Sequence, residues 1–518
     1  MITIYDTTLR DGTQREGMSL SVEDKLRIVA RLDDLGVHYI EGGFAGSNPK
    51  DVEFFERVRS LDLKNAVVSA FGSTRRKGIA AADDPGLRAL LDSGCRAVCV
   101  VGKSWDVHVT EALGASLEEN LAMVGESVAF LKEAGLIVFF DAEHFFDGHA
   151  ANADYAVAVC RAAAEAGAEA VVLCDTNGGT MPHRVAAVVR EVAAKVAVPL
   201  GIHAHNDAAC AVADTLVAVD AGCTHVQGTI NGYGERTGNA DLTAIIPALV
   251  LKMGEECVTR DQLRLLTEVS HFVAETANVS PNPQQPYVGA SAFAHKGGLH
   301  ASATGKLAGA YEHIDPGAVG NLARVIVSEL AGRASLTMKA KELGIDLGAD
   351  PATATHILDA VKDLEHRGYS FEAADASLDI LLRKKTGTYT PLFSLESFRC
   401  LMEKREDGRV MTEATIKLWV GEERFIATAE GNGPINALDS ALRLAIGGLY
   451  PALEAIELTD FKVRVLDEKK GTAAVTRVLI ASDDGVETWG TVGVSENIIE
   501  ASWEALVDSI EYGLTHEH

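Results

Sequence analysis

Cysteine is scarce in this chain, which has 8 cysteines among 518 residues and no CxxC pair. The cysteines lie mostly inside apolar segments, a placement typical of buried thiols in a reducing compartment rather than of a disulfide framework. The N-terminal stretch MITIYDTTLRDG also lacks the positive segment and apolar run of a secretory signal. We therefore expect a cytoplasmic protein.

Long apolar runs and an excess of positive charge are missing as well. Although 47% of the residues are hydrophobic, charge or glycine interrupts each apolar run before the roughly 18 residues that a membrane span needs. The formal net charge of −27 disfavours general binding to nucleic acid. Neither a Walker loop nor a dinucleotide fingerprint is present. We expect small-molecule ligands, with no nucleic acid and no membrane as partners.

Residues 2–253 alternate between short β-rich runs and amphipathic helical stretches. The runs read ITIYD, VHYIEGG, AVVSAFG, RAVCVVG, LIVFFDAE, AVVLCD, PLGIHAH and HVQGTI. Eight strand–helix units in about 250 residues are typical of a (β/α)8 TIM barrel, and a doubly wound sheet is the alternative. We predict an α/β protein whose residues 1–255 form a TIM-barrel catalytic domain.

The pattern changes twice beyond the barrel. Residues 256–390 are mostly helical in pattern and predict an accessory or linker region. Residues 391–518 alternate strands such as TEATIKLWV and AAVTRVLIAS with helices expected at 433–446 and 496–513. Two similar ββ(β)α units predict a separate C-terminal α+β domain.

Two histidines, His203 and His205, end the seventh predicted strand in the segment GIHAHND. Positions i and i+2 of a strand face the same way, so the pair could bind a metal. The spacing alone is weak, because 16 histidines in this chain give about 0.5 such pairs by chance. His516 and His518 share the spacing in the tail, where nothing indicates a site. The position of the first pair is more informative than its spacing.

Polar residues also follow the other predicted strands, at the rim where barrel enzymes build their active sites. Arg10 and Asp11 follow the first strand, and the loop NGYGERTGN follows the eighth. Strands one, seven and eight are neighbours in a closed barrel, so Asp11 would meet the histidine pair. One carboxylate and two imidazoles hold a divalent cation and leave positions open for substrate and water. Asn239 could be a fourth ligand, directly or through water, whereas Asp11 taken alone could be a turn residue.

A guanidinium beside a metal-polarised carbonyl stabilises the alkoxide that forms on attack, and we predict this role for Arg10. Glu143, after the fifth strand, could orient Arg10 by a bidentate contact, or could be a solvated loop carboxylate. Thr176 could donate to a substrate carboxylate or belong to an ordinary turn. The segment FAHKGGLH contains His295 and His300. Either histidine would suit proton transfer if it lies near the metal, and would otherwise be a structural residue.

Together, the segments YDTTLRDGTQ, HAHND, NGYGERTGNADL and FAHKGGLHA resemble the metal-dependent acyltransferases that include the isopropylmalate, homocitrate and citramalate synthases. The motif DTTLRDG is shared by a wider superfamily that also holds a hydroxymethylglutaryl-CoA lyase and carboxyltransferase domains. Its combination with GNGPINAL (431–438) and a C-terminal α+β domain is narrower. The segments EGGFAGSNPKD, DAEHFFDG and GTVGVSENIIEASWEALVDSIEYGL are most similar to the citramalate synthases. The resemblance covers nearly the whole chain.

This resemblance implies an acyltransferase that adds acetyl-CoA to a 2-oxo acid and then hydrolyses the thioester. The acid would be pyruvate, with citramalate formed for isoleucine biosynthesis; isopropylmalate synthase, homocitrate synthase and an acyl-CoA lyase are the alternatives. The cofactor would be a divalent cation, Mg²⁺, Mn²⁺ or Zn²⁺. The C-terminal domain would be regulatory, with a possible amino-acid effector, and the assembly a homodimer.

The resemblance also implies a role for each matched residue. The metal ligands would be Asp11, His203 and His205, with Asn239 close by. Arg10 would be the catalytic arginine with Glu143 as its partner, and Thr176 a substrate contact. His300, assisted by Tyr311, would be the general base.

Overall fold

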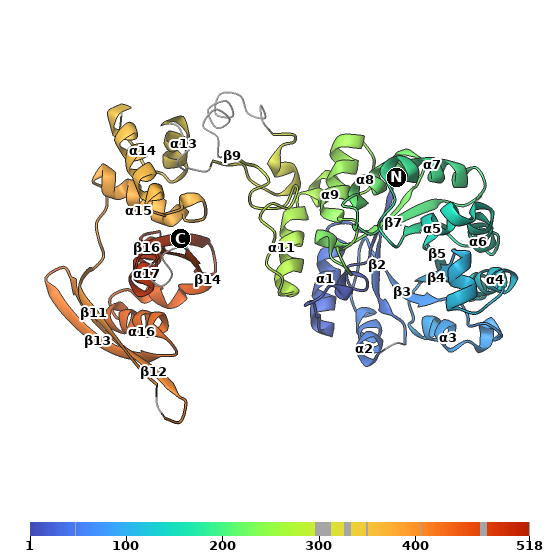
Figure 1. The fold of residues 1–518 in the computed structure, drawn as a ribbon, viewed down its shortest axis with the longest axis horizontal. Coiled ribbons are helices and arrows are strands. Elements are labelled where there is room, and N and C mark those ends of the chain that lie inside the picture. The colour runs from blue at the N-terminus through green and yellow to red at the C-terminus, as the bar shows by residue number, and fades with distance from the viewer. Residues whose placement is uncertain are drawn as a thin grey trace. The chain divides into compact units, whose positions relative to one another are not determined.

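The computed structural model describes residues 1–46, 48–295, 312–325, 333–348, 351–404, 406–466 and 474–516. The chain divides into two compact units (Figure 1). The first comprises Met1–Phe293 with Glu312–Leu322, and the second Ala294–Tyr311 with Ala323–His518. Among the described residues, no helix has the length and apolar character to cross a membrane.

The first unit is built on a closed barrel of parallel strands, which confirms the predicted TIM barrel. The strands are β1 (Thr3–Asp6), β2 (Tyr39–Phe44), β3 (Val67–Ser73), β4 (Ala97–Lys103), β5 (Ile137–Glu143), β6 (Ala170–Asp175), β7 (Leu200–Ala204) and β8 (His225–Gly228). The strands are short and rich in Val, Ile and aromatic residues, as expected for strands that are buried on both faces.

Helices surround this barrel (Figure 1). They are α1 (Val22–Asp34), α2 (Pro49–Val58), α3 (Pro85–Asp92), α4 (Leu117–Glu133), α5 (Phe145–Ala151), α6 (Ala153–Glu165), α7 (Pro182–Ala193), α8 (Ala211–Asp220) and α9 (Leu242–Ala248). Their starts follow local rules of capping. Ser21 and Asp24 form a capping box at α1, and α2, α3 and α7 each begin with a proline in the first turn.

An aromatic cluster fills the interior of the barrel away from the rim. Tyr5, Tyr39 and Phe139 pack together, with ring centroids 5.5 Å apart between Tyr5 and Phe139 and 4.8 Å apart between Tyr39 and Phe139. The Cys99 side chain belongs to the same buried cluster. These side chains fill this part of the barrel interior as a packed core.

Closure of the barrel sets which strand ends meet. β1 pairs with β8 from Thr3 opposite His225 to Asp6 opposite Gly228. β8 in turn pairs with β7, placing Gln227 opposite His203. The turn after β1 therefore lies beside the end of β7, as the sequence predicts.

The rest of the first unit and the start of the second are largely helical. The helices are α10 (Arg260–Leu263), α11 (Leu266–Thr276), α13 (Arg333–Glu342), α14 (Pro351–His366) and α15 (Asp375–Thr386). A two-residue pairing of β9 (Ala294–His295) with β10 (Arg324–Val325) accompanies them in the second unit. Along the described chain as a whole, single-turn helices occur at η1 (Gly12–Gln14), η2 (Ala81–Asp83), η3 (His108–Ala112), η4 (Ile230–Gly232), η5 (Leu249–Met253), η6 (Pro316–Val319), η7 (Phe371–Ala373) and η8 (Pro451–Ala455).

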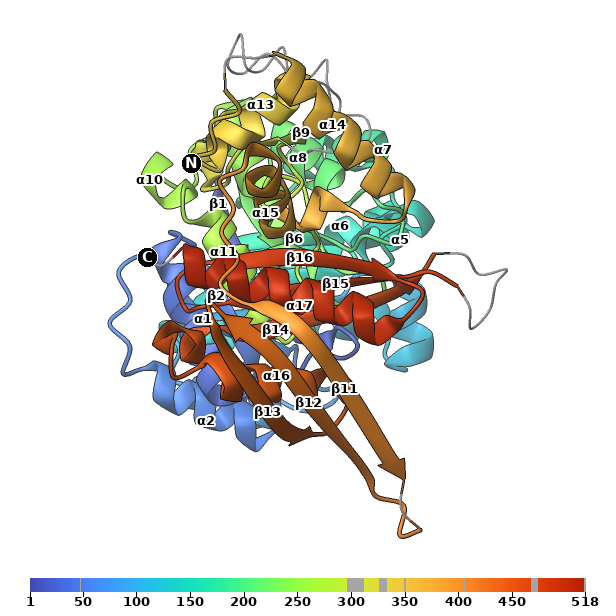
Figure 2. The ribbon, with the colours of Figure 1, turned by 90° about the vertical axis from the view of Figure 1, so that its left-hand side faces the viewer.

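The C-terminal part is an α+β structure built from two similar βββα units (Figure 2). The first contains β11 (Ser394–Lys404), β12 (Val410–Val420), β13 (Glu423–Gly431) and α16 (Pro434–Ile446). The second contains β14 (Glu457–Val465), β15 (Thr476–Asp483), β16 (Thr488–Ser495) and α17 (Ile498–Thr515). Each helix packs on its own sheet around a shared apolar core. Strand β11 was not among the predicted strands, because SLESFRCLMEK is mostly exposed and rich in residues that favour helices.

Candidate active site

The turn that follows β1 is held in place by a buried carboxylate. Asp6 accepts hydrogen bonds from the Thr8 amide at 2.9 Å and from the Thr8 hydroxyl at 2.7 Å. The Thr8 hydroxyl also accepts the Ile230 amide, at 2.9 Å, from the loop after β8. Burial raises the pKa of Asp6 to about 7. These hydrogen bonds connect the turn after β1 to the loop after β8, and so fix the positions of Arg10 and Asp11.

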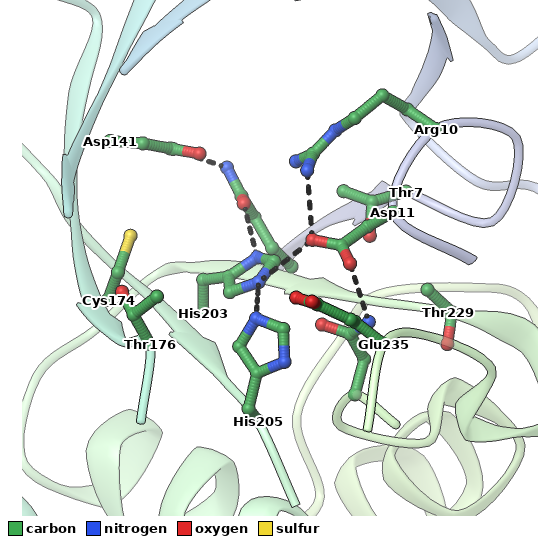
Figure 3. A network of polar contacts seen from close by, with 12 residues as sticks. Thr7, Arg10, Asp11, Asp141, Cys174, Thr176, His203, His205, Thr229 and Glu235 are labelled. Atoms are coloured by element: carbon green, nitrogen blue, oxygen red, sulfur yellow. Dashed lines mark hydrogen bonds and ion pairs between the residues drawn. The ribbon is translucent and has the colours of Figure 1, made fainter. Parts of the chain in front are cut away.

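Asp11, His203 and His205 form a buried cluster at the carboxyl ends of β1 and β7 (Figure 3). His203 Nε2 lies 3.4 Å from Asp11 Oδ2 and 3.4 Å from His205 Nε2. One potential ligand atom from each of the three residues lies within 4.8 Å of the others. The sequence-predicted trio is therefore brought together.

Asn239 lies beside this cluster and contacts Asp11. Its Nδ2 donates to Asp11 Oδ1 at 3.1 Å and to the Tyr233 carbonyl at 3.0 Å. Its Oδ1 is buried and has no hydrogen-bond partner within the described residues. A buried, unpaired amide oxygen beside a carboxylate and two imidazoles fits a divalent cation, because such groups are its usual oxygen and nitrogen ligands.

The Arg10 guanidinium lies beside the cluster with two carboxylates. Its Nη1 donates to Asp11 Oδ2 at 2.9 Å, and its Nε donates to Glu41 Oε2. Its Cζ lies over the Phe71 ring, 3.9 Å from the ring centroid. Burial opposes ionisation of Asp11, yet the adjacent Arg10 and His203 outweigh that effect and hold its pKa well below the usual range. The arginine is thus fixed in a low-dielectric site with its charge compensated.

The carboxylate partners of Arg10 are Asp11 and Glu41, so the predicted contact between Arg10 and Glu143 is wrong. Glu143 pairs instead with Lys103. The strand order explains the difference: β2 adjoins β1, whereas β5 adjoins β4 with Glu143 directly opposite Lys103. Sequence reasoning gave Glu41 no role, because that role follows only from knowing that β1 and β2 are neighbours.

Glu41 is itself supported from below. It is fully buried, and the Tyr5 hydroxyl lies 3.0 Å from its Oε1 and 2.9 Å from Ser69 Oγ. Burial raises the pKa of Glu41, while the charge of Arg10 opposes that rise. Three strands therefore contribute side chains that position one guanidinium.

Thr176 lies at the end of β6 on the same rim (Figure 3). Its Oγ1 accepts the His144 amide at 2.8 Å. Its carbonyl accepts from Arg236 at 2.7 Å, and Arg236 also binds both carboxylate oxygens of Asp207 at 2.8 Å. This contact ties the NGYGERTGN loop to the loops after β6 and β7.

Gly238 allows the same loop to fold back on itself. Its φ is +97°, and a Cβ at this position would lie 2.1 Å from the Gly232 carbonyl oxygen. A side chain therefore cannot be accommodated without moving the backbone. The fold-back places Asn239 in a bridge with His205.

The predicted general base His300 and its assistant Tyr311 lie outside the described residues. His295 is described, and is part of β9 in the second unit. Their predicted roles stay predictions.

Comparisons with known proteins match the whole length of the chain. The HMGL-like family model matches residues 1–273, the homocitrate synthase post-HMGL domain-like model residues 287–368, and the LeuA allosteric (dimerisation) domain model residues 372–514. The (R)-citramalate synthase of Streptomyces coelicolor is 54% identical, over 99% of this chain and 96% of that protein. That of Geobacter sulfurreducens is 52% identical, over 99% of this chain and 98% of that protein.

The chain belongs to the (R)-citramalate synthase family. Among solved structures, hydroxymethylglutaryl-CoA lyase from Pseudomonas aeruginosa is 20% identical, with a TM-score of 0.46 over 54% of this chain and 94% of that one. As expected for the synthase family, this chain carries a LeuA-type domain after the barrel.

We expect a divalent cation to stabilise the metal-free protein through the Asp11–His203–His205 cluster. A ligand that binds only the native state adds about 2.7 kcal/mol at 100 times its Kd, so Mn²⁺ should raise the Tm measurably. His203→Ala should abolish this rise. His149→Ala, which changes a buried histidine outside the cluster, should retain it. A full Tm rise in His203→Ala, measured by differential scanning fluorimetry, would refute the site.

Proposed function

We propose that this chain condenses acetyl-CoA with pyruvate to form (R)-citramalate and CoA, as an acyltransferase that converts the acyl group into an alkyl group on transfer. The whole-length identity to curated (R)-citramalate synthases carries the proposal. The convergence of Arg10, Asp11 and the histidine pair on one rim supports it. The pathway served would be isoleucine biosynthesis.

Each rim residue has a proposed part. A divalent cation, Mg²⁺, Mn²⁺ or Zn²⁺, held by Asp11, His203 and His205 with Asn239 close by, would supply Lewis acidity toward the keto acid. Arg10, held by Glu41, stabilises the negative charge that grows on the attacked oxygen. Thr176 donates its hydroxyl hydrogen to the substrate carboxylate.

Proton removal from acetyl-CoA is assigned to His300, assisted by Tyr311, on the resemblance alone. Glu143, which pairs with Lys103, is also proposed as a catalytic residue at the rim. Hydrolysis of the thioester then makes the overall reaction effectively irreversible. Such a step suits feedback control.

The proposed domain organisation follows the change in pattern along the chain. Residues 1–255 form the catalytic domain, 256–390 the helical linker region, and 391–518 the regulatory domain. The match to a LeuA allosteric (dimerisation) domain supports a homodimer and an amino-acid effector, for which isoleucine is proposed.

A cavity of about 540 Å³ at the ends of β3, β4 and β5 suits the co-substrate. Its lining includes the exposed cations Arg76 and Lys77, with Lys103 and the apolar Phe44 close to the rim. Acetyl-CoA joins three phosphate groups to a long, partly apolar arm. We propose that Arg76 and Lys77 bind its phosphates and that the arm runs toward the rim.

Substrate choice is tested by thiol release from acetyl-CoA with pyruvate, 2-oxoisovalerate and 2-oxoglutarate. We expect kcat/KM for pyruvate to exceed the others by at least about tenfold, since each methylene misfit is worth roughly 1–3 kcal/mol. Arg10→Ala should lose turnover with every acid. Preference for another acid would overturn the assignment of pyruvate.

Reversal of the two cavity cations tests the acetyl-CoA site. Arg76→Glu with Lys77→Glu should raise the KM for acetyl-CoA by roughly tenfold or more, because surface ion pairs are worth up to about 1 kcal/mol each and reversal adds repulsion. The KM for pyruvate should stay unchanged. Arg184→Glu with Arg190→Glu, on exposed positions of α7, makes the same change in charge as a control. An equal rise in KM from the control pair would contradict the site.

A further inference from the structure

One buried glutamine spans the gap between a predicted metal ligand and a carboxylate across the barrel. Gln227 lies in β8, is fully buried, and is opposite His203 in the strand register. Its Oε1 lies 2.8 Å from His203 Nδ1, and its Nε2 donates to Asp141 Oδ1 at 2.9 Å. Asp141 comes from β5 and is 3% exposed. Figure 3 shows Asp141 and His203 at the two ends of this chain of contacts.

We propose that Asp141 and Gln227 act together as positioning residues, fixing the His203 ring with a hydrogen on Nδ1 so that Nε2 is the atom turned toward the metal. The inference deepens the proposed function and rests on the metal site proposed there. Neither residue belongs to the predicted ligand set.

The amide of a glutamine presents a donor on one side and an acceptor on the other. Gln227 Nε2 donates to Asp141 Oδ1, so the NH₂ group of the amide is turned toward Asp141. The carbonyl oxygen must then face His203. That oxygen cannot donate, so His203 Nδ1 has to carry the hydrogen of the contact. With Nδ1 engaged in this way, Nε2 is the ring nitrogen left to bind a metal.

His203 Nε2 points toward the other members of the cluster. His203 Nε2 faces Asp11 Oδ2 and His205 Nε2, each at 3.4 Å. Nε2 can donate a hydrogen to Asp11 Oδ2 in the metal-free protein, and a cation replaces that hydrogen on binding. The Asp141–Gln227 pair therefore holds the His203 ring with Nδ1 engaged and Nε2 turned toward the metal position, as outer hydrogen bonds do for metal-bound histidines.

The second histidine of the cluster lacks such support. His205 Nδ1 is buried and has no hydrogen-bond partner within the described residues. The two histidines share a sequence motif but differ in how their rings are held. Of the two, His203 is the ligand whose tautomer the barrel interior sets.

The test measures the Kd for Zn²⁺ of the metal-free full-length chain, by competition with a chromophoric chelator. Gln227→Met removes both hydrogen bonds at similar volume and should raise the Kd about 10- to 100-fold. The exchanged pair Asp141→Asn with Gln227→Glu moves the negative charge to position 227 and still presents an acceptor to His203 Nδ1. It should restore the Kd to within about threefold of wild type, which a merely structural role would not predict.

Asn120→Leu is the matched control, because it removes a fully buried amide that donates to the Lys103 carbonyl and Tyr155 hydroxyl, away from the cluster. It should leave the Kd unchanged. If Gln227→Met fails to fold, Asp141→Asn alone decides the matter. The new amide can then donate to Gln227 Oε1, both amide orientations become allowed, and the Kd should rise several-fold until Gln227→Glu is added.

The outcomes separate the inference from the function on which it rests. Wild-type protein that binds no Zn²⁺ would overturn the metal site itself. Wild-type binding with an unchanged Kd in Gln227→Met would overturn only the positioning role. An exchanged pair as weak as Gln227→Met would do the same.

Discussion

The pairing of β1 with β8 is the constraint on which the site depends. These strands lie at opposite ends of the barrel sequence, and their hydrogen bonds from Thr3 to Asp6 close the sheet. Closure places the turn carrying Asp11 beside the end of β7, which carries the histidines. Without it the ligands would belong to separate edges of an open sheet.

Charge compensation is the second requirement, because the rim groups are buried. Arg10 lies between Glu41 and Asp11. Removing one partner from such a buried set costs far more stability than removing one partner from an exposed ion pair. The arrangement leaves a fixed positive group next to the place where negative charge would develop. Fixed charges in a water-poor site need little reorganisation during reaction, which is why they are effective in catalysis.

The barrel and the meeting of its strand ends could be predicted from the sequence. Alternating β-rich and amphipathic segments predicted the barrel, and the strand-end positions of Asp11 and His203 predicted their meeting, because both depend only on strand order. The partner of Arg10 was not predictable in the same way. Choosing Glu41 over Glu143 requires knowing which side chains converge, and both carboxylates lie in barrel strands.

Gln227 illustrates the same limit more sharply. A single glutamine in the buried strand HVQG was a visible signal, since an amide inside a barrel needs partners. Its partners His203 and Asp141 are 24 and 86 residues away, so only the register of β7 and β8 reveals them. Strand β11 was missed for a different reason: its exposed face removes the alternation that identifies a strand.

The claim that the rim is a metal centre built from two imidazoles and oxygen ligands is tested most directly by X-ray absorption spectroscopy of the Zn²⁺-loaded chain. Such a centre should give imidazole scattering from two histidines, with nitrogen and oxygen at about 2.0–2.2 Å. We expect no sulfur, because burial raises the pKa of the nearby Cys174 thiol well above its usual range and keeps it protonated. A shell without imidazole, or one containing sulfur at about 2.3 Å, would contradict it.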